Sequence, residues 1–396
     1  MVSKRLALVV AFLLVVPGCS SSGVAATDLA PIVERDGVPF EGSAIPNEVL
    51  LYLAGYPVVV IGETHLIREQ RDFTAALVEG LWAHGYRQML LEWPHMADWI
   101  VSEYVVDGDF APGGWNPPMW LYGDLLEEIR DFNRGLAQGE RMEVRGIDIN
   151  LDNYGGAEVF LESLGDLSRR LPSRGPLGPF LEQPYDTPEA QTAALGSLQA
   201  ALTAERDRLI DSWGQPWYER VNEMVEIEQG SVPVRTKWDV DPDESARPRE
   251  RLMKQLADAR LAGYEYGSVV NVGGNHAQKK RLKGTNHEWL GDYLVNRSTA
   301  PSGPVISVVV VPASITTDYP TDLPDWAVSD SSPANELFRI IHESWPGRTV
   351  FLPFADPIFR EGKVAMNFED TIHIDSPQRF YDAAVLLPIA HRIPIP

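Results

Sequence analysis

The apolar positions of this chain fall into short continuous runs separated by longer amphipathic segments. Continuous rather than alternating runs are typical of strands that helices cover on both faces of a sheet. Five runs have the length of buried strands and two later ones are similar: Val58–Ile61, Gln88–Leu91, Val144–Ile147, Ser268–Val272 and Val305–Val311, then Thr349–Phe354 and Tyr381–Leu387. We therefore predict an α/β fold built on a central sheet.

The segment between the first two runs has helical periodicity. Phe73, Leu77, Leu81 and Trp82 recur at a spacing that places them on one side of a helix, and Gly85 ends the pattern. A strand, a helix and a second strand within about 40 residues form a βαβ unit, which requires parallel strands. We expect a mostly parallel central sheet with flanking helices.

The stretch at about 152–261 has a different pattern. It contains two long helical segments, Pro188–Trp213 and Trp217–Gln229, and loops rich in proline and glycine. We interpret this stretch as a helical insertion that caps the carboxyl-terminal ends of the strands. It would belong to a single α/β domain that covers residues 46–396.

The N-terminus indicates export. The apolar run Leu6–Val16 follows two basic residues. It is too short to span a bilayer, which takes about 20 residues, and it has the length of a signal-peptide core. The run closes with Gly18 and Cys19, an arrangement that resembles the bacterial lipoprotein box.

From this pattern we expect residues 1–18 to be a lipoprotein signal peptide and Cys19 to carry acyl chains. Residues 19–45 would form a tether and N-terminal segment. The protein would then be lipid-anchored in the bacterial cell envelope, at the outer membrane or the cell surface. The alternative is an ordinary signal peptide with an incidental cysteine.

Composition and charge exclude several classes of function. The 396 residues are 44% hydrophobic, enough for a sizeable core. The net charge of −22 repels phosphate backbones and argues against a nucleic-acid partner. The single cysteine excludes both a disulfide framework and a cysteine-based zinc site. Histidines and carboxylates remain as the candidate ligands.

Acidic residues and histidines follow four of the predicted strands. In an open parallel sheet, ligands bind beyond the carboxyl ends of the strands, and packing does not require polar groups at all four ends. We therefore predict a site at this edge of the sheet. The residues found there are, in chain order, Glu63, His65, Glu92, His95, Asp148, Asn150 and His276.

Two of these segments share the pattern glycine, two residues, histidine: Gly62-Glu63-Thr64-His65 and Gly273-Gly274-Asn275-His276. We interpret the leading glycine as permitting a sharp turn after the strand. For the other residues a structural role competes with a functional one. Asp148 and Asn150 also suit helix capping, and His95 also suits a solvated loop.

Two histidines with two or three carboxylates allow two kinds of chemistry. They could activate a water as general bases, with the carboxylates orienting each imidazole, or hold a hard or borderline divalent cation. A nearby arginine would stabilise a developing oxyanion. The chain lacks the Gly-x-Ser-x-Gly elbow, the Walker loop, His-Glu-x-x-His, and Gly-x-Gly-x-x-Gly after a strand, which disfavours serine hydrolases and dinucleotide enzymes.

The order of these motifs resembles one superfamily, which comprises the erythromycin esterases, the ChaN-like haem-binding lipoproteins and the Tiki metalloproteases. The resemblance rests on the two glycine–histidine segments, on Glu92 between them, and on Arg249–Met253 and Phe380–Val385. It spans about Val58 to Leu387.

By this resemblance, His65 corresponds to the general base that activates water in the esterases. Glu63 and Glu92 would orient it or bind metal, and Arg249 and His276 would complete the site. In the Tiki proteases, two such histidine motifs and a glutamate hold a divalent metal. The metal ligands that this relative implies are Glu63, His65, Glu92 and His276. The ChaN-like proteins bind haem in a dimer, which implies haem as the alternative cofactor and a homodimer.

Two functions remain open. The first is an exported, lipid-anchored hydrolase of an ester, lactone or amide, with or without a metal. The second is a non-catalytic haem- or iron-binding lipoprotein of the ChaN-like type. Retention of both histidines with Glu63, Glu92 and Arg249 favours the hydrolase, because haem needs only one or two axial ligands. We predict that Glu63, Glu92 and both histidines face one pocket.

Overall fold

The computed structural model describes most of the chain from residue 26 to residue 393. The described residues are 26–107, 122–151, 156–183, 187–238, 242–281, 287–312, 315–316, 336–361, 364, 366–368, 372–374, 376–391 and 393. The predicted signal peptide and Cys19 lie outside them. Within these ranges, no helix has the length and apolar character needed to cross a membrane.

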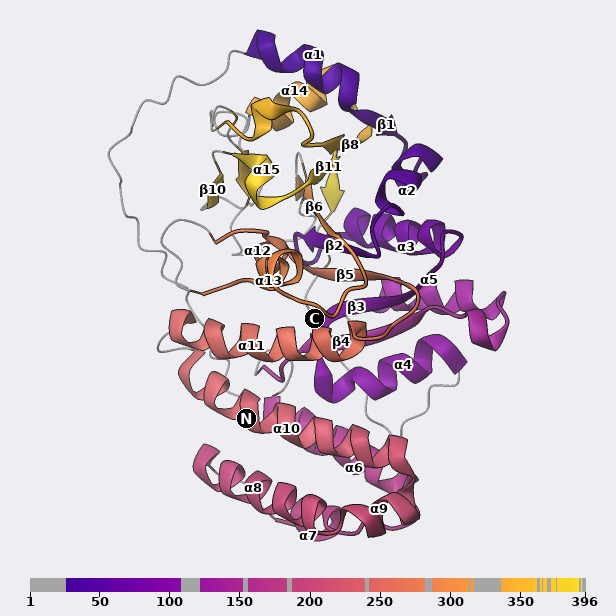
Figure 1. The fold of residues 1–396 in the computed structure, drawn as a ribbon, viewed down its shortest axis with the longest axis vertical. Coiled ribbons are helices and arrows are strands. Elements are labelled where there is room, and N and C mark those ends of the chain that lie inside the picture. Colours follow the sequence, from indigo (N-terminus) through magenta and orange to yellow (C-terminus); the bar gives the residue numbers. More distant parts are fainter. Residues whose placement is uncertain are drawn as a thin grey trace.

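An eight-stranded sheet forms the centre of the molecule, with the strand order β1-β8-β11-β6-β2-β5-β3-β4 (Figure 1). Neighbouring strands from β11 to β4 are parallel, whereas β8 is antiparallel to both β1 and β11. The sheet strands are β1 (Val38–Phe40), β2 (Val58–Glu63), β3 (Tyr86–Pro94), β4 (Glu143–Asp148), β5 (Gly267–Gly273), β6 (Val305–Pro312), β8 (Thr349–Pro353) and β11 (Ala383–Leu387).

The predicted α/β class and mostly parallel sheet are confirmed. Each of the seven apolar runs is a strand of this sheet, and β2 and β6 are buried along their whole length. The strand that the pattern did not indicate is β1, which has three residues and buries only Phe40. Two small strand pairs lie outside the sheet: β9 (Met366–Phe368) with β10 (Ile372–Ile374), and β7 (Ile315–Thr316) with β12 (Ala390–His391).

The folded region extends N-terminal of residue 46. The helix α1 (Ala26–Asp36) buries Leu29 and Val33 and packs on α14 (Glu336–Ser344), and β1 follows it into the sheet. Figure 1 shows both helices at the β1–β8 end of the molecule, away from the helical insertion. Part of the predicted N-terminal segment is therefore integral to the fold.

The predicted helix between β2 and β3 is α3 (Arg68–Trp82), which buries Phe73, Leu77 and Leu81. Other helices flank the sheet or lie at its ends: α2 (Asn47–Leu53), the 3-10 turns His95–Ala97, Gln138–Glu140 and Pro357–Phe359, α4 (Asp98–Asp107), α5 (Gly123–Arg134), α12 (Gly274–Ala277), α13 (Leu290–Asn296) and α15 (Pro377–Phe380).

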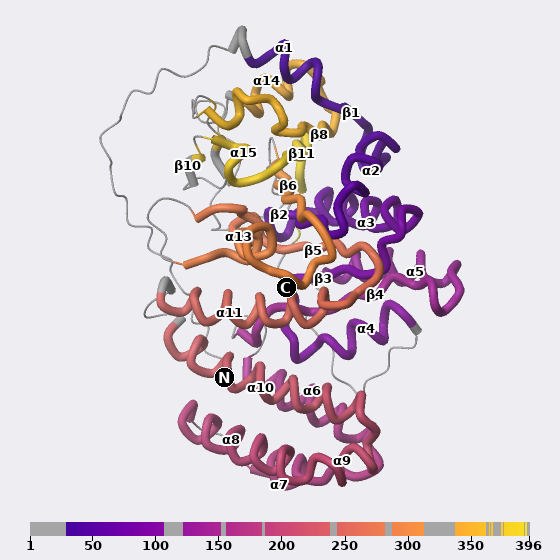
Figure 2. The backbone as a smooth tube through the Cα atoms, in the orientation of Figure 1, coloured from indigo at the N-terminus to yellow at the C-terminus, as the bar shows by residue number. Residues whose placement is uncertain are grey.

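The helical insertion is present and lies beyond β4. Its α11 contacts β4 and packs on α10, and α10 packs on α8, so successive helices lie farther from the sheet (Figures 1 and 2). The predicted helix at 188–213 divides at Glu205, and the one at 217–229 is part of a longer helix. The insertion contains α6 (Gly156–Arg170), α7 (Leu177–Leu181), α8 (Pro188–Ala204), α9 (Arg206–Trp213), α10 (Gln215–Trp238) and α11 (Pro242–Leu261).

Candidate functional site

The five residues that the sequence singles out meet at one place beyond the strand ends. Glu63 ends β2, His65 follows it, and His276 lies on α12 directly after β5. Glu92 lies near the end of β3, and Arg249 reaches the same place from α11 of the insertion. Because β5 lies between β2 and β3 in the sheet, the three strands deliver their polar residues side by side.

Glu92 is the residue on which the others converge. Its Oε1 lies 2.5 Å from Nη2 of Arg249 and 3.3 Å from Nε2 of His276, and its Oε2 lies 3.8 Å from Nε2 of His65. The backbone N–H of Gly273 donates to Oε2 at 2.6 Å. The register between β3 and β4 shifts between Leu91 and Pro94, so Glu92 lies in an irregularity of the kind that redirects side chains.

The glycines serve close packing, so the sharp-turn interpretation is wrong. Neither Gly62 nor Gly273 has a positive φ. A Cβ atom on Gly273 would lie 2.8 Å from Nε2 of His65 and 3.3 Å from Oε2 of Glu92. A Cβ atom on Gly62 would lie 2.8 Å from Cβ of Ala277. Only a residue without a side chain lets the two histidine segments approach each other this closely.

Glu63 orients His65. Oε1 of Glu63 lies 2.8 Å from Nδ1 of His65 and accepts a hydrogen bond from the hydroxyl of Tyr122 at 2.5 Å. Its Oε2 accepts from Nδ2 of Asn271 at 2.6 Å. The next residue after His65, Leu66, has a φ of 64°, a left-handed conformation that non-glycine residues adopt mainly where the surroundings enforce it. The turn carrying His65 is thus fixed by its side-chain contacts.

His276 has a similar partner on its own Nδ1. That nitrogen forms a hydrogen bond with Oε1 of Glu250, the residue after Arg249 on α11. The ring also makes an edge contact with Trp289, with centroids 5.4 Å apart. Both imidazoles therefore present Nδ1 to a glutamate and Nε2 to Glu92. A carboxylate on Nδ1 fixes the tautomer and orientation of a histidine, which leaves Nε2 for proton transfer.

Arg249 ties the insertion to two strand ends. Its Nη2 donates to Glu92 at 2.5 Å and to Oδ2 of Asp148 at 2.7 Å, and its Nε donates to Oδ1 of Asp148 at 2.9 Å. Asp148 also accepts from the backbone N–H of Ile149. Between the two alternatives left open for Asp148, the structure shows a carboxylate that positions the arginine of the site.

The charges of this cluster stabilise one another. Partial burial disfavours the imidazolium form of His65, but the carboxylates of Glu92 and Glu63 outweigh it and raise the pKa of His65 to about 9. Burial acts the same way on His276, and Glu92 with Glu250 raises its pKa to about 10. For Glu92, the two imidazoles and Arg249 outweigh burial and hold its pKa well below its usual range. At neutral pH both histidines are mostly cationic.

Two candidates from the strand ends serve the structure instead. His95 is buried and its Nε2 lies 2.9 Å from Oε2 of Glu223 on α10. Asn150 accepts from the backbone N–H of Met96 and donates to the buried Glu228, also on α10. Both residues attach the insertion to the sheet. His95 does not lie in a solvated loop, and Asn150 accepts from an N–H of the 3-10 turn His95–Ala97.

Three partners of the site escaped the sequence reasoning. Asn271 interrupts an otherwise apolar strand, which is a detectable sign of a polar role. Glu250 lies beside Arg249 in the segment Arg249–Met253, which resembles a segment of the superfamily named above. Tyr122 carries no such sign, because only the fold brings it to Glu63, 59 positions earlier.

The predicted metal ligands Glu63, His65, Glu92 and His276 lie in one cluster with Arg249. Arg249 already supplies positive charge next to Glu92, while the Nδ1–glutamate contacts leave both Nε2 atoms facing Glu92. Across the described ranges, no group of three or more histidine, cysteine or acidic side chains is placed to hold a metal. The metal set of Glu63, His65, Glu92 and His276 stays a prediction.

The comparisons with known proteins show the fold. No family model matches the chain, and no curated protein matches it at a significant level. A Bacillus cereus protein of known structure aligns with a TM-score of 0.66 and 15% identity, over 93% of this chain and 99% of its own. A histidine variant of erythromycin esterase EreC in its open conformation aligns with a TM-score of 0.60 and 16% identity, over 88% and 95%.

A succinoglycan biosynthesis protein aligns with a TM-score of 0.61 and 13% identity, over 95% of this chain and 99% of its own. Likeness at these identities shows the fold alone. The suspected relationship is therefore confirmed at the level of fold: the chain shares the architecture of an erythromycin esterase over most of its length.

Proposed function

We propose that this protein is a hydrolase of an ester, lactone or amide that uses a histidine–glutamate site. The observation that carries the proposal is the pair of imidazoles whose Nδ1 atoms are held by Glu63 and Glu250 and whose Nε2 atoms face Glu92. The fold shared with an erythromycin esterase agrees with this chemistry.

His65 is the general base of the proposed reaction. Its side chain is 37% exposed, whereas that of His276 is 9% exposed, so His65 is the imidazole that a substrate and a water can reach. In its neutral form, Nε2 of His65 takes a proton from water, and the hydroxide attacks the carbonyl carbon. Glu63 stabilises the imidazolium that results.

His276 and Arg249 supply positive charge to the transition state. Both contact Glu92 and stay cationic at neutral pH, so they stabilise the oxyanion that develops on the carbonyl oxygen. When the tetrahedral intermediate collapses, the leaving oxygen or nitrogen receives a proton from the imidazolium of His65. The base is thereby restored for the next turnover.

The test is hydrolysis of a panel of 4-nitrophenyl esters and lactones by the purified protein and by His65→Gln. Loss of the base should lower kcat by about 10³-fold. His342→Gln serves as the control, because His342 is exposed on α14. No turnover of any substrate by the wild-type protein, or equal turnover by His65→Gln, would overturn the proposal.

We further propose that the hydrolase is lipid-anchored through Cys19 in a bacterial cell envelope. The support is the sequence from Leu6 to Cys19. Cells that express the full chain should incorporate radiolabelled palmitate into the protein, and Cys19→Ser should abolish labelling. Labelling that persists in Cys19→Ser would contradict the proposal.

A further inference from the structure

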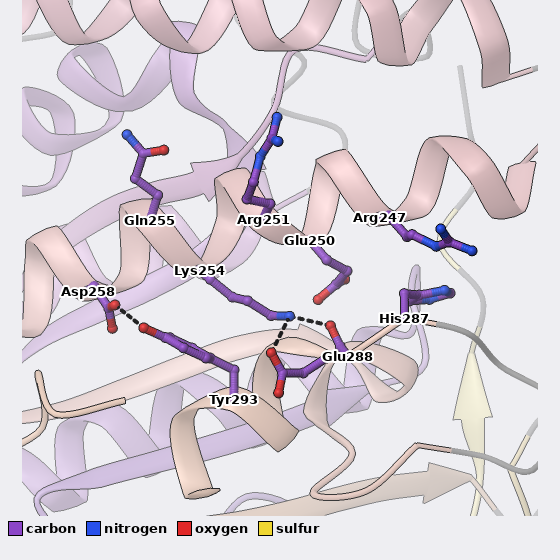
Figure 3. Close-up of a pocket in the computed structure, with 9 residues that line it drawn as sticks. All are labelled: Arg247, Glu250, Arg251, Lys254, Gln255, Asp258, His287, Glu288 and Tyr293. Carbon is purple, nitrogen blue, oxygen red and sulfur yellow. Dashed lines mark hydrogen bonds and ion pairs between the residues drawn. The ribbon is translucent and has the colours of Figure 1, made fainter. Parts of the chain in front are cut away.

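A cleft lies beside the site, between one side of α11 and the segment that leads into α13 (Figure 3). Its volume is about 620 Å³, within the range of pockets that hold small molecules. All nine residues that line it are polar or charged: Arg247, Glu250, Arg251, Lys254, Gln255, Asp258, His287, Glu288 and Tyr293.

Glu250 joins this cleft to the site. Its Oε1 forms the hydrogen bond with His276, while its Oε2 is buried and has no hydrogen-bond partner among the described residues. Figure 3 shows the Glu250 side chain extending from α11 toward the space between Lys254 and His287. Leaving a buried carboxylate oxygen without a donor costs about 1–3 kcal/mol or more. A ligand with a hydrogen-bond donor would remove this cost.

The charges of the lining residues indicate which class of ligand fits the cleft. The lining contains three cationic residues, Arg247, Arg251 and Lys254, and three acidic ones, Glu250, Asp258 and Glu288, so the formal charges cancel. Two of the acids already have partners: Lys254 lies 3.1 Å from Oε2 of Glu288, and the Tyr293 hydroxyl donates to Asp258. The cleft therefore favours neither an anion nor a cation.

A group rich in hydroxyls matches such a lining. Each hydroxyl both donates and accepts, so it can donate to the free oxygen of Glu250 and accept from Lys254 or an arginine. A long alkyl chain would instead leave Oε2 of Glu250 buried without a donor, which is costly. The free oxygen of Glu250 thus favours a ligand that carries hydroxyls over a purely apolar one.

We propose that this cleft binds a sugar unit of the substrate, with one sugar hydroxyl donating to Oε2 of Glu250. The proposal rests on the hydrolase function proposed above and names its substrate class as an O-acylated carbohydrate. Because Glu250 also holds His276, a sugar in the cleft contacts the carboxylate that positions one of the two imidazoles. Glu250 would then both bind the sugar and position His276.

The first test compares two acetate esters that differ only in the alcohol: 6-O-acetyl-D-glucose and ethyl acetate. Acetate release should show a kcat/KM at least about tenfold higher for the sugar ester. In Lys254→Met, which keeps the aliphatic stem and removes the donor, the ratio of the two kcat/KM values should fall about tenfold. Lys237→Met, an exposed lysine at the end of α10, is the matched control and should leave the ratio unchanged.

The second test measures binding without turnover. Isothermal titration with methyl α-D-glucopyranoside should give binding to the wild-type protein and to His65→Gln, and binding about tenfold weaker to Lys254→Met. Equal kcat/KM values for the two esters together with no glucoside binding would overturn the sugar site and leave the hydrolase standing. Glucoside binding without hydrolysis of either ester would instead overturn the hydrolase and leave the sugar site.

Discussion

Two clusters of buried charge at the strand ends contain the same kinds of residue in different arrangements. The site cluster consists of Glu63, His65, Glu92, Arg249 and His276. The anchoring cluster consists of His95, Asp98, Arg145, Glu223 and Arg260. Each has at least one histidine, two carboxylates and an arginine, and each connects the sheet to the insertion.

The difference is where the polar atoms point. In the anchoring cluster, Arg145 forms a two-pronged contact with Asp98, at 3.0 and 2.7 Å, and Arg260 donates to Glu223 at 2.5 Å. In the site cluster, His65 stays 37% exposed and its Nε2 is 3.8 Å from the nearest carboxylate oxygen, beyond a good hydrogen bond. Residue type alone therefore does not mark a site; a reachable and unsatisfied nitrogen does.

The largest expected effect comes from a substitution that breaks the anchoring cluster. Asp98→Asn leaves Arg145 without its carboxylate, and Arg145 and Arg260 together hold the pKa of Asp98 below its usual range. Removing one partner of a buried ion pair costs about 3–5 kcal/mol. Urea unfolding should show a loss of this order, with kcat of the folded variant within about twofold of wild type, because no atom of this cluster touches the reacting groups. A kcat loss as large as that of His65→Gln would show that the two clusters are not separate.

Gly273→Ala acts on the site cluster through shape alone. The added methyl group would lie 2.8 Å from Nε2 of His65, so the imidazole must shift away from Glu92. A misplacement of about 1 Å of a catalytic group lowers kcat by about 10²-fold. Gly139→Ala is the matched control, because nothing lies near the added atom. Gly263→Ala would not serve, because Gly263 has a positive φ. Wild-type kcat in Gly273→Ala would show that His65 does not need its present position.

The sequence predicted which residues meet but not which arrangement each adopts. Apolar runs identify the strands because burial on both faces leaves a continuous pattern, and parallel strands bring Glu63, Glu92 and His276 to one edge. Position after a strand does not by itself separate His65 from His95; the glycine–histidine pattern favoured His65. The environments of the two histidines differ because α10 brings Glu223 to His95. These two residues are 128 positions apart in the sequence, so no local pattern encodes their contact.

Tyr122→Phe gives a smaller and more selective effect on the site cluster. The hydroxyl donates to Oε1 of Glu63, the same oxygen that faces Nδ1 of His65, and so draws charge away from that imidazolium. Without it, Glu63 stabilises the imidazolium more strongly, and the pKa of His65 is expected to rise further. The kcat/KM of the wild-type protein should rise with pH up to about 9, because the neutral imidazole is the proposed base.

In Tyr122→Phe, that rise should move to higher pH, and kcat/KM at pH 7 should fall about tenfold. Tyr104→Phe is the comparison, since Tyr104 lies on α4 away from the site. A profile of unchanged midpoint in Tyr122→Phe would show that the tyrosine only packs against Trp93, to which its ring is 5.8 Å distant.

The smallest expected effect is on stability at alkaline pH. The pKa values of His65 and His276 are raised from 6.5 to about 9 and about 10, so their contribution is complete below pH 6.5 and is lost as the pH rises through 9 to 10. Solvent screens the share of the more exposed His65, so His276 contributes most.

The thermal midpoint of the wild-type protein should therefore fall by a few degrees more between pH 6.5 and 10 than that of the double variant His65→Gln/His276→Gln. Subtracting the two curves of thermal midpoint against pH removes the contribution of lysines and tyrosines that titrate elsewhere in the protein. Identical curves would mean that the carboxylates of the site cluster do not hold the imidazoles in their charged form, and His65 would then titrate near its ordinary pKa. In that case the alkaline rise in kcat/KM should also move down toward pH 6.5, so the two measurements check each other.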